Sequence, residues 1–212
     1  MADILLDNEA NPATPSSGKI VLLGNTTTKK LTTVNADGII DTVGGLTNHS
    51  TANQTGFASD TYLTGSGIAI PPGLVRAGTT YHLRFDMVKT GAGTAAPVLS
   101  IRFGTAGTTS DTAQLTFTFG AGTANADTAV FEMWAHWRNV GASSVLVGVC
   151  ACTHLLAATG MISTGASGAG ILVVTSGAFN SAVASSIIGA SFNGGASFSG
   201  TNVLVQSRLL AA

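Results

Sequence analysis

Charged side chains are scarce in this 212-residue chain, and their scarcity excludes several classes of protein. Nine Lys and Arg and ten Asp and Glu make up 9% of the residues, whereas soluble domains average about 25%. Disorder combines low hydrophobicity with high net charge, so it is not expected in a chain that is 45% hydrophobic with a formal charge of −1. No basic cluster is denser than Lys29-Lys30, which predicts no nucleic-acid binding.

Long apolar runs, helix-forming residues and cysteines are also few. The absence of a run of about 18 apolar residues predicts no membrane insertion, and Met1-Ala2-Asp3 lacks the basic and then apolar pattern of a secretory signal. We therefore expect synthesis in a cytoplasm. Lys, Glu, Arg and Gln, which favour surface helices, are rare. Cys150 and Cys152 alone give no disulfide framework.

Small and hydroxylated residues make up half of the chain. The chain has 31 Ala, 29 Thr, 27 Gly and 19 Ser, together half of its residues, and such a composition favours strands and tight turns. Charge is concentrated in residues 1–41, which hold five of the ten acids and three of the four lysines. This shift predicts an N-terminal module over residues 1–45, a polar linker over 46–56 and a main domain over 57–212.

The N-terminal module is predicted to be small and β-rich. Strand candidates cover residues 19–23, 29–34 and 39–43, and turn-forming residues separate them. Three strands of this length bury little apolar surface by themselves. We therefore expect the module to pack against another copy of itself or a docking partner.

The main domain alternates between apolar and polar residues with the period of a half-buried strand. In residues 81–87 the odd positions are apolar and the even positions polar. Seven further segments follow, at residues 99–103, 114–119, 131–138, 145–155, 171–174, 187–192 and 203–210. In residues 131–138, Trp137 falls on the core face. In residues 145–155, Val147 and Val149 belong to the apolar series. The pattern predicts an all-β, antiparallel, jelly-roll-like β-sandwich.

Cys150, Cys152 and His154 form the one cluster with the chemistry of a metal site. They alternate along a predicted strand, so their side chains share a face opposite Val147 and Val149. Sulfur and imidazole suit zinc or copper, but residues two apart in a strand are about 6.5 Å apart, which is wide for neighbouring ligands of one ion. Burial as small apolar residues is the favoured interpretation, metal binding is the weaker alternative, and no cofactor is predicted.

Trp134, His136 and Arg138 are predicted to share the outer face of their strand. An exposed Trp134 ring could stack on a sugar, and the face as a whole is either plain outer surface or a subunit interface. We favour the interface, because Trp and Arg are enriched at interface cores.

No catalytic residues are predicted. Asp127 and Glu132 are the nearest pair of acids in the main domain, but five residues apart in a strand they point to opposite faces, and both are expected to be solvated. A polysaccharide hydrolase would need two carboxylates about 5 to 9.5 Å apart. That activity remains an alternative, which would depend on Asp127 or Glu132.

Several segments resemble the β-rich domains of tailed-bacteriophage fibre and head-decoration proteins. In the main domain these are residues 61–71 (TYLTGSGIAIP), 89–95 (KTGAGTA), 102–113 (RFGTAGTTSDTA), 138–143 (RNVGAS) and 154–160 (HLLAATG). Near the start, residues 12–22 (PATPSSGKIVL) and Asp37-Gly38 are similar to the short modules that precede fibre domains.

The resemblance implies a non-enzymatic virion protein. It implies a homotrimer of jelly-roll-like domains displayed on the virion surface and anchored to a capsid or tail protein through residues 1–45. Only a short segment separates the two parts, so a head fibre or decoration protein is favoured over a long tail fibre. The alternative is a tail receptor-binding protein that recognises host-surface glycans.

Overall fold

The computed structural model describes residues 45–156, 159–163 and 170–210, together with the backbone of three short strands nearer the N-terminus. These strands are β1 (Val21–Gly24), β2 (Leu31–Val34) and β3 (Ile40–Thr42), and they form an antiparallel sheet in that order. The three strands predicted for the N-terminal module are therefore present. The rest of residues 1–44, including the predicted docking segment, lies outside the described residues.

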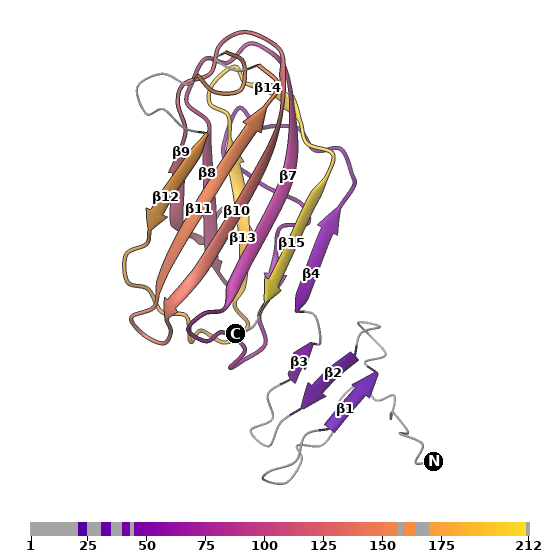
Figure 1. The fold of residues 1–212 in the computed structure, drawn as a ribbon, viewed down its shortest axis with the longest axis vertical. Helices are drawn as coiled ribbons and strands as arrows, with labels where there is room; N and C mark the ends of the chain where they lie inside the picture. The colour runs from indigo at the N-terminus through magenta and orange to yellow at the C-terminus, as the bar shows by residue number, and fades with distance from the viewer. Residues whose placement is uncertain are drawn as a thin grey trace.

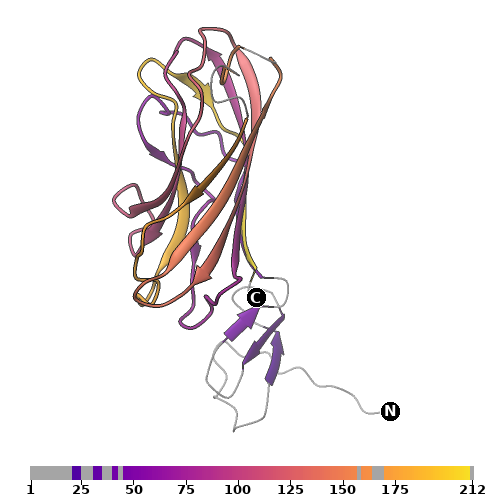
Figure 2. The same cartoon turned by 60° about the vertical axis from the view of Figure 1, so that its left-hand side comes forward.

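The main domain consists of two antiparallel sheets packed face to face (Figures 1 and 2). The larger sheet has seven strands: β12 (Ile171–Thr175), β11 (Val145–His154), β10 (Asp127–Asn139), β7 (Thr80–Gly91), β15 (Val205–Leu210) and β4 (Leu46–Ser50) in spatial order, with β14 (Ser199–Thr201) paired to β7. The smaller sheet has five: β5 (Thr61–Tyr62), β13 (Ile187–Asn193), β8 (Val98–Gly104) and β9 (Thr112–Thr118) in order, with β6 (Ile68–Ala69) paired to β13.

Alternating burial along each long strand produces the layered core. In β7 from Tyr81 to Lys89 and in β10 from Asp127 to Trp137, the odd-numbered residues face the other sheet and are buried, while the even-numbered residues face outward. Phe85, Phe131 and Phe192 meet between the sheets with ring centroids 4.8 to 5.7 Å apart. Trp137 is also buried, as predicted. The all-β antiparallel sandwich expected from the sequence is confirmed, and all eight predicted strand segments contain strands.

The prediction of a linker over residues 46–56 is wrong for its first half. Residues 46–50 form β4, which pairs along its whole length with β15. Polar residues obscured the strand, because Thr47, Asn48 and His49 are all exposed at a sheet edge. The Asn48 amide donates a hydrogen bond of 2.7 Å to the Gly67 carbonyl. Polar partners on both faces removed the alternation on which the prediction depended.

The buried face of β11 also differs from the prediction. The apolar series through Val147 and Val149 lies on the outer face, and Leu146, Gly148, Cys150 and Cys152 face the core. Every residue on both faces is uncharged as far as His154, so hydrophobicity alone did not identify the inner face. The burial of both cysteines confirms the favoured interpretation of that pair.

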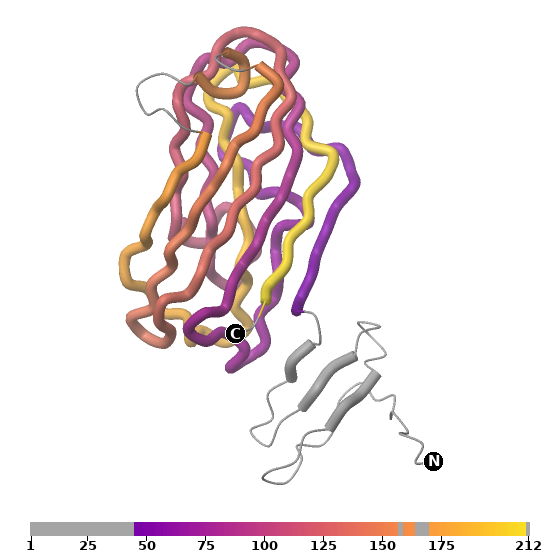
Figure 3. The backbone as a smooth tube through the Cα atoms, viewed as in Figure 1, coloured from indigo at the N-terminus to yellow at the C-terminus, as the bar shows by residue number. Residues whose placement is uncertain are grey.

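The two ends of the sandwich are distinct. β7 begins at Thr80, which pairs with Leu210 near the C-terminus, and it ends near Lys89, which pairs with Asp127. Figure 3 traces the backbone and shows the turns from β7 to β8 and from β9 to β10 together at the end opposite the C-terminus. None of the described residues forms a helix long and apolar enough to cross a membrane.

Candidate functional site

The outer face of the seven-stranded sheet changes character from one edge to the other. Figure 1 looks onto this face, with β8, β9 and β13 behind it. One cross-strand row runs from the β12 edge to the β4 edge through successive register partners: Val173, Val149, Trp134, His82, Arg208 and Thr47. Partners in such a row lie about 5 Å apart, so the row passes from aliphatic through aromatic to cationic side chains.

The half of the face over β11 and β12 is apolar. Ile171 and Val173 are 59% and 71% exposed on β12, the outermost strand of the sheet. Their register partners on β11 are Ala151 and Val149, which lie on the same outer face and are half-buried. An aliphatic strip on an edge strand is typical of a surface that another chain covers. We call the outward-facing residues of β11 and β12 the aliphatic strip.

The centre of the face holds four interacting side chains. The His82 and Trp134 rings stack with centroids 3.8 Å apart. His82 Nε2 lies 3.0 Å from Glu132 Oε1, and Arg208 Nε donates a hydrogen bond of 3.0 Å to His82 Nδ1. Because the arginine can only donate, Nδ1 accepts and the proton resides on Nε2, which donates to Glu132. We call these four residues the His82 cluster.

The surroundings of His82 favour its neutral form. Burial lowers the pKa of His82 below its ordinary value, and although the hydrogen bond to Glu132 opposes this, the positive charges of Arg208 and Arg84 lower it further. The His82 ring is therefore neutral near pH 7, and it holds Arg208 in a fixed position through Nδ1.

An open pocket of about 320 Å³ adjoins the His82 cluster over β15 and β4. Its lining is polar: Thr47, Asn48, His49, His82, Gln206, Ser207 and Arg208. Gln206 and Arg208 face outward from β15 beside their register partners His49 and Thr47. The pocket therefore presents one guanidinium, two imidazoles and amide or hydroxyl groups.

The structure places the predicted interface residues on this same face. Trp134 stacks on His82, and His136 Nδ1 lies 2.9 Å from the Thr80 hydroxyl. Arg138 is exposed and sits where the β10–β11 register shifts, outside the regular pairing. That the three side chains share the outer face is confirmed, and their role in an interface stays a prediction.

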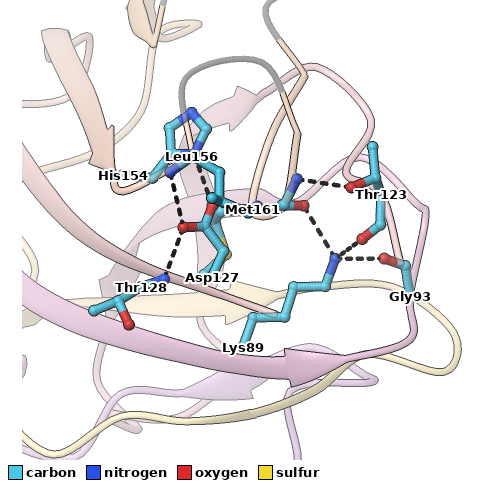
Figure 4. A network of polar contacts seen from close by, with 9 residues as sticks. Lys89, Gly93, Thr123, Asp127, Thr128, His154, Leu156 and Met161 are labelled. Carbon is cyan, nitrogen blue, oxygen red and sulfur yellow. Dashed lines mark hydrogen bonds and ion pairs between the residues drawn. The ribbon is translucent and has the colours of Figure 1, made fainter. Parts of the chain in front are cut away.

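A second polar group is buried at the loop end of the sandwich (Figure 4). The Lys89 side chain points into the core, and the residue is 1% exposed. Its ammonium donates hydrogen bonds to the carbonyls of Gly93 at 2.7 Å, Gly160 at 3.1 Å and Thr123. Each carbonyl belongs to a different loop, so Lys89 ties together the loops that follow β7, β9 and β11.

Asp127 completes this network from the adjacent strand. Its carboxylate accepts backbone hydrogen bonds from Thr128 at 2.8 Å, Leu156 at 3.2 Å and Met161 at 2.8 Å, and it lies 2.7 Å from His154 Nδ1 (Figure 4). Burial raises the pKa of Asp127, but these hydrogen bonds outweigh it and hold the pKa below its ordinary value. The prediction that Asp127 is solvated is therefore wrong, because its partners come from a loop about 30 residues later in the chain.

The network also changes the interpretation of the predicted metal cluster. His154 is engaged with Asp127, while Cys150 and Cys152 face the core between the sheets. Burial raises the pKa of the Cys150 thiol strongly and that of Cys152 to about 12. Among residues 45–156, 159–163 and 170–210, no three His, Cys, Asp or Glu side chains are grouped as a metal ion would require.

Asp127 and Glu132 do not form a catalytic pair. As predicted, they face opposite sides of β10: Asp127 is 5% exposed in the core, and Glu132 lies on the outer face beside His82. Two carboxylates on opposite faces of one strand cannot flank the same glycosidic bond. The hydrolase alternative therefore loses the two residues on which it depended.

Sequence reasoning missed His82, Arg208 and Lys89. His82 and Arg208 are 126 residues apart and become neighbours only through the β7–β15 pairing. The burial of Lys89 could have been predicted, because the odd-numbered residues of this alternating strand face the core and Lys89 is one of them. Neither the protein-family models nor the curated proteins compared with this sequence match it.

Proposed function

We propose that the chain is a non-enzymatic structural protein of a bacteriophage virion, displayed as a homotrimer and anchored through residues 1–45. The observation that carries the proposal is the aliphatic strip, in which Ile171 and Val173 remain 59% and 71% exposed on an edge strand of the single chain. Natural proteins normally protect such edges. A second copy of the chain is the partner that the uncharged strip fits best.

The direction of the chain supports display on a particle. It enters the sandwich at Leu46, beside Leu209, whereas the Lys89 network lies at the other end of β7. If residues 1–45 attach to the virion, the end held by Lys89 faces outward. The similarity of residues 12–22 and 61–71 to phage fibre sequences supports the same arrangement.

Oligomeric state is the first test. Light scattering on the purified full-length chain is expected to give three times the chain mass of 21.1 kDa. Val173→Asp puts a charge in the strip and is expected to give monomers with an unchanged β-sheet circular dichroism spectrum. Val183→Asp makes the same change at another exposed valine, 39% exposed and outside the strip, and should leave the trimer intact. A wild-type monomer would overturn the assembly proposal.

Location on the particle is the second test. Deleting residues 1–45 is expected to remove the protein from purified phage particles while leaving the remainder folded. Electron microscopy of particles labelled through the protein's C-terminus distinguishes a head position, which we propose, from a tail position. Truncated protein that still copurifies with particles would overturn the proposed anchoring.

A further inference from the structure

The carboxylates of the main domain are committed to contacts within the chain. Asp86 Oδ1 accepts hydrogen bonds from the backbone of Val203 and Leu204, and Asp111 accepts from the backbone of Ala106 and Gly107. Asp60, Asp127 and Glu132 pair with Arg102, His154 and His82 respectively. These five are all the acids of residues 45–210. Each one therefore already has a partner.

Most of the arginines have no ion-pair partner among the described residues. Lys89 and Arg102 are held by internal partners, but none of the ion pairs in the described part of the chain involves Arg84, Arg138 or Arg208. All three project from the outer face of the seven-stranded sheet. Three of the four histidines, His49, His82 and His136, lie on the same face, with Glu132 as its one ion-paired carboxylate. Asp86 also lies on this face, where its carboxylate accepts hydrogen bonds from the backbone of Val203 and Leu204. The face therefore carries three arginines against two carboxylates and is weakly electropositive.

Arg208 is the one of these three arginines that lines the pocket over β15 and β4. Arg208 Nε is held by His82, and the guanidinium carbon lies 5.8 Å from the Trp134 ring centroid. The two terminal nitrogens of the guanidinium form no hydrogen bond with the described residues. A guanidinium binds a planar carboxylate through paired hydrogen bonds. The Gln206 amide and His49 imidazole, on neighbouring strands, add groups that hydrogen-bond to hydroxyls.

We propose that this pocket binds a carboxylated sugar unit of an acidic polysaccharide, with Arg208 holding the carboxylate. The volume of about 320 Å³ is at the lower end of the range for small-molecule sites, which suits one or two sugar rings rather than a folded partner. Trp134 does not line this pocket, and His82 covers one face of its ring at 3.8 Å, so the pocket offers no aromatic platform for the sugar. Recognition instead relies on charge and hydrogen bonds.

The site is compatible with assembly through the aliphatic strip. β12 and β4 are opposite ends of the seven-stranded sheet, so a partner packed on Val173 leaves the pocket beside Arg208 open. The binding proposal does not rest on the trimer or on the virion, and its test uses the isolated protein. The two proposals can therefore fail separately.

Isothermal titration of the full-length protein with trigalacturonate tests the proposal, with the neutral galactose trimer and inorganic phosphate as comparison ligands. Trigalacturonate is expected to bind at least tenfold more tightly than either, and its affinity should fall as salt rises from 50 to 200 mM. Arg208→Gln is expected to weaken binding at least tenfold, and Arg208→Lys should restore it only in part because the paired hydrogen bonds are lost. Arg138→Gln removes the same charge from the same face outside the pocket and should change affinity less than twofold.

Three results would overturn the proposal. The first is equal affinity for the acidic and the neutral trimer, or no binding of either. The second is phosphate binding as tight as that of trigalacturonate, which would show a site for any small anion. The third is an equal loss in Arg138→Gln and Arg208→Gln, which would show attraction by the whole face. Circular dichroism and an unchanged unfolding midpoint establish that each variant is folded.

Discussion

Lys89 and Asp127 are register partners on β7 and β10, and both point into the sandwich, where they are 1% and 5% exposed. Each charge is satisfied mainly by loop backbone, Lys89 by three carbonyls and Asp127 by three amides and His154. The Gly160 carbonyl accepts from Lys89, while a Cβ on Gly160 would lie 2.3 Å from Asp127 Oδ2. The two opposite charges thus fix the same loop from two sides.

Removing one of these buried charges should lower the free energy of unfolding more than removing a charge from the protein surface. Lys89→Met leaves three buried carbonyls without their donor and removes the positive charge near Asp127, and we expect a loss of about 3 kcal/mol in the free energy of unfolding. Urea denaturation measures it. Arg84→Met removes a cation from the outer face of the same strand and should change stability by less than about 0.5 kcal/mol. Equal midpoints for Lys89→Met and the wild type would contradict the structural role.

Asp127 should make the protein sensitive to acid. Because its pKa is lowered in the folded state, the unfolded chain binds the proton more tightly, so folding stability falls as pH drops below the ordinary Asp pKa of about 3.9. Above that value the stabilisation is complete. Asp127→Asn is expected to be less stable than the wild type at pH 6, with the gap closing as pH approaches 2. A gap that stays constant between pH 6 and pH 2 would show that Asp127 contributes no proton linkage.

His82 should give a separate dependence at higher pH. Its pKa is lowered mainly by burial, so the unfolded chain takes up the proton first, and stability falls as pH drops below the ordinary His pKa of about 6.5. The free energy of unfolding of His82→Gln is expected to vary less between pH 7.5 and 5 than that of the wild type. His49→Gln, which changes an exposed histidine on β4, serves as the control. Identical slopes in His82→Gln and the wild type would contradict the assignment.

The alternation of apolar and polar residues was sufficient to predict the β-sandwich but not the polar contacts between its strands and loops. Segments such as β7 and β10 alternate so regularly that both the strands and their buried faces were predictable. β4 was not, because its three central residues, Thr47, Asn48 and His49, are all polar and exposed. His82 contacts Glu132 and Arg208, which are 50 and 126 positions away, and Lys89 reaches carbonyls 34 and 71 positions away. Such contacts depend on which strands are neighbours in the sheet, and the local sequence does not predict that order.

The buried cysteines should be unreactive in the folded protein. Burial raises the pKa of Cys152 to about 12 and that of Cys150 further, and the thiolate is the reactive form. Mass spectrometry after iodoacetamide treatment at pH 8 is expected to find almost no labelling of native protein and two adducts in urea. Rapid labelling of the native state would show that the β11 end of the core opens to solvent.

Gly148 allows β11 to approach β9. It lies on the inner face of β11, and a Cβ there would be 2.7 Å from Leu115 Cδ1 and 2.8 Å from Phe117 Cζ. Gly148→Ala is therefore expected to destabilise the fold by about 1–3 kcal/mol through overpacking. Gly177→Ala is the matched control, since a Cβ there meets nothing within 4 Å, and its unfolding midpoint in urea should equal that of the wild type. Leu115→Ala combined with Gly148→Ala should cost less than the sum of the single changes, because shortening Leu115 makes room for the new methyl group. Strict additivity of the two losses would show that this contact does not limit the approach of the sheets.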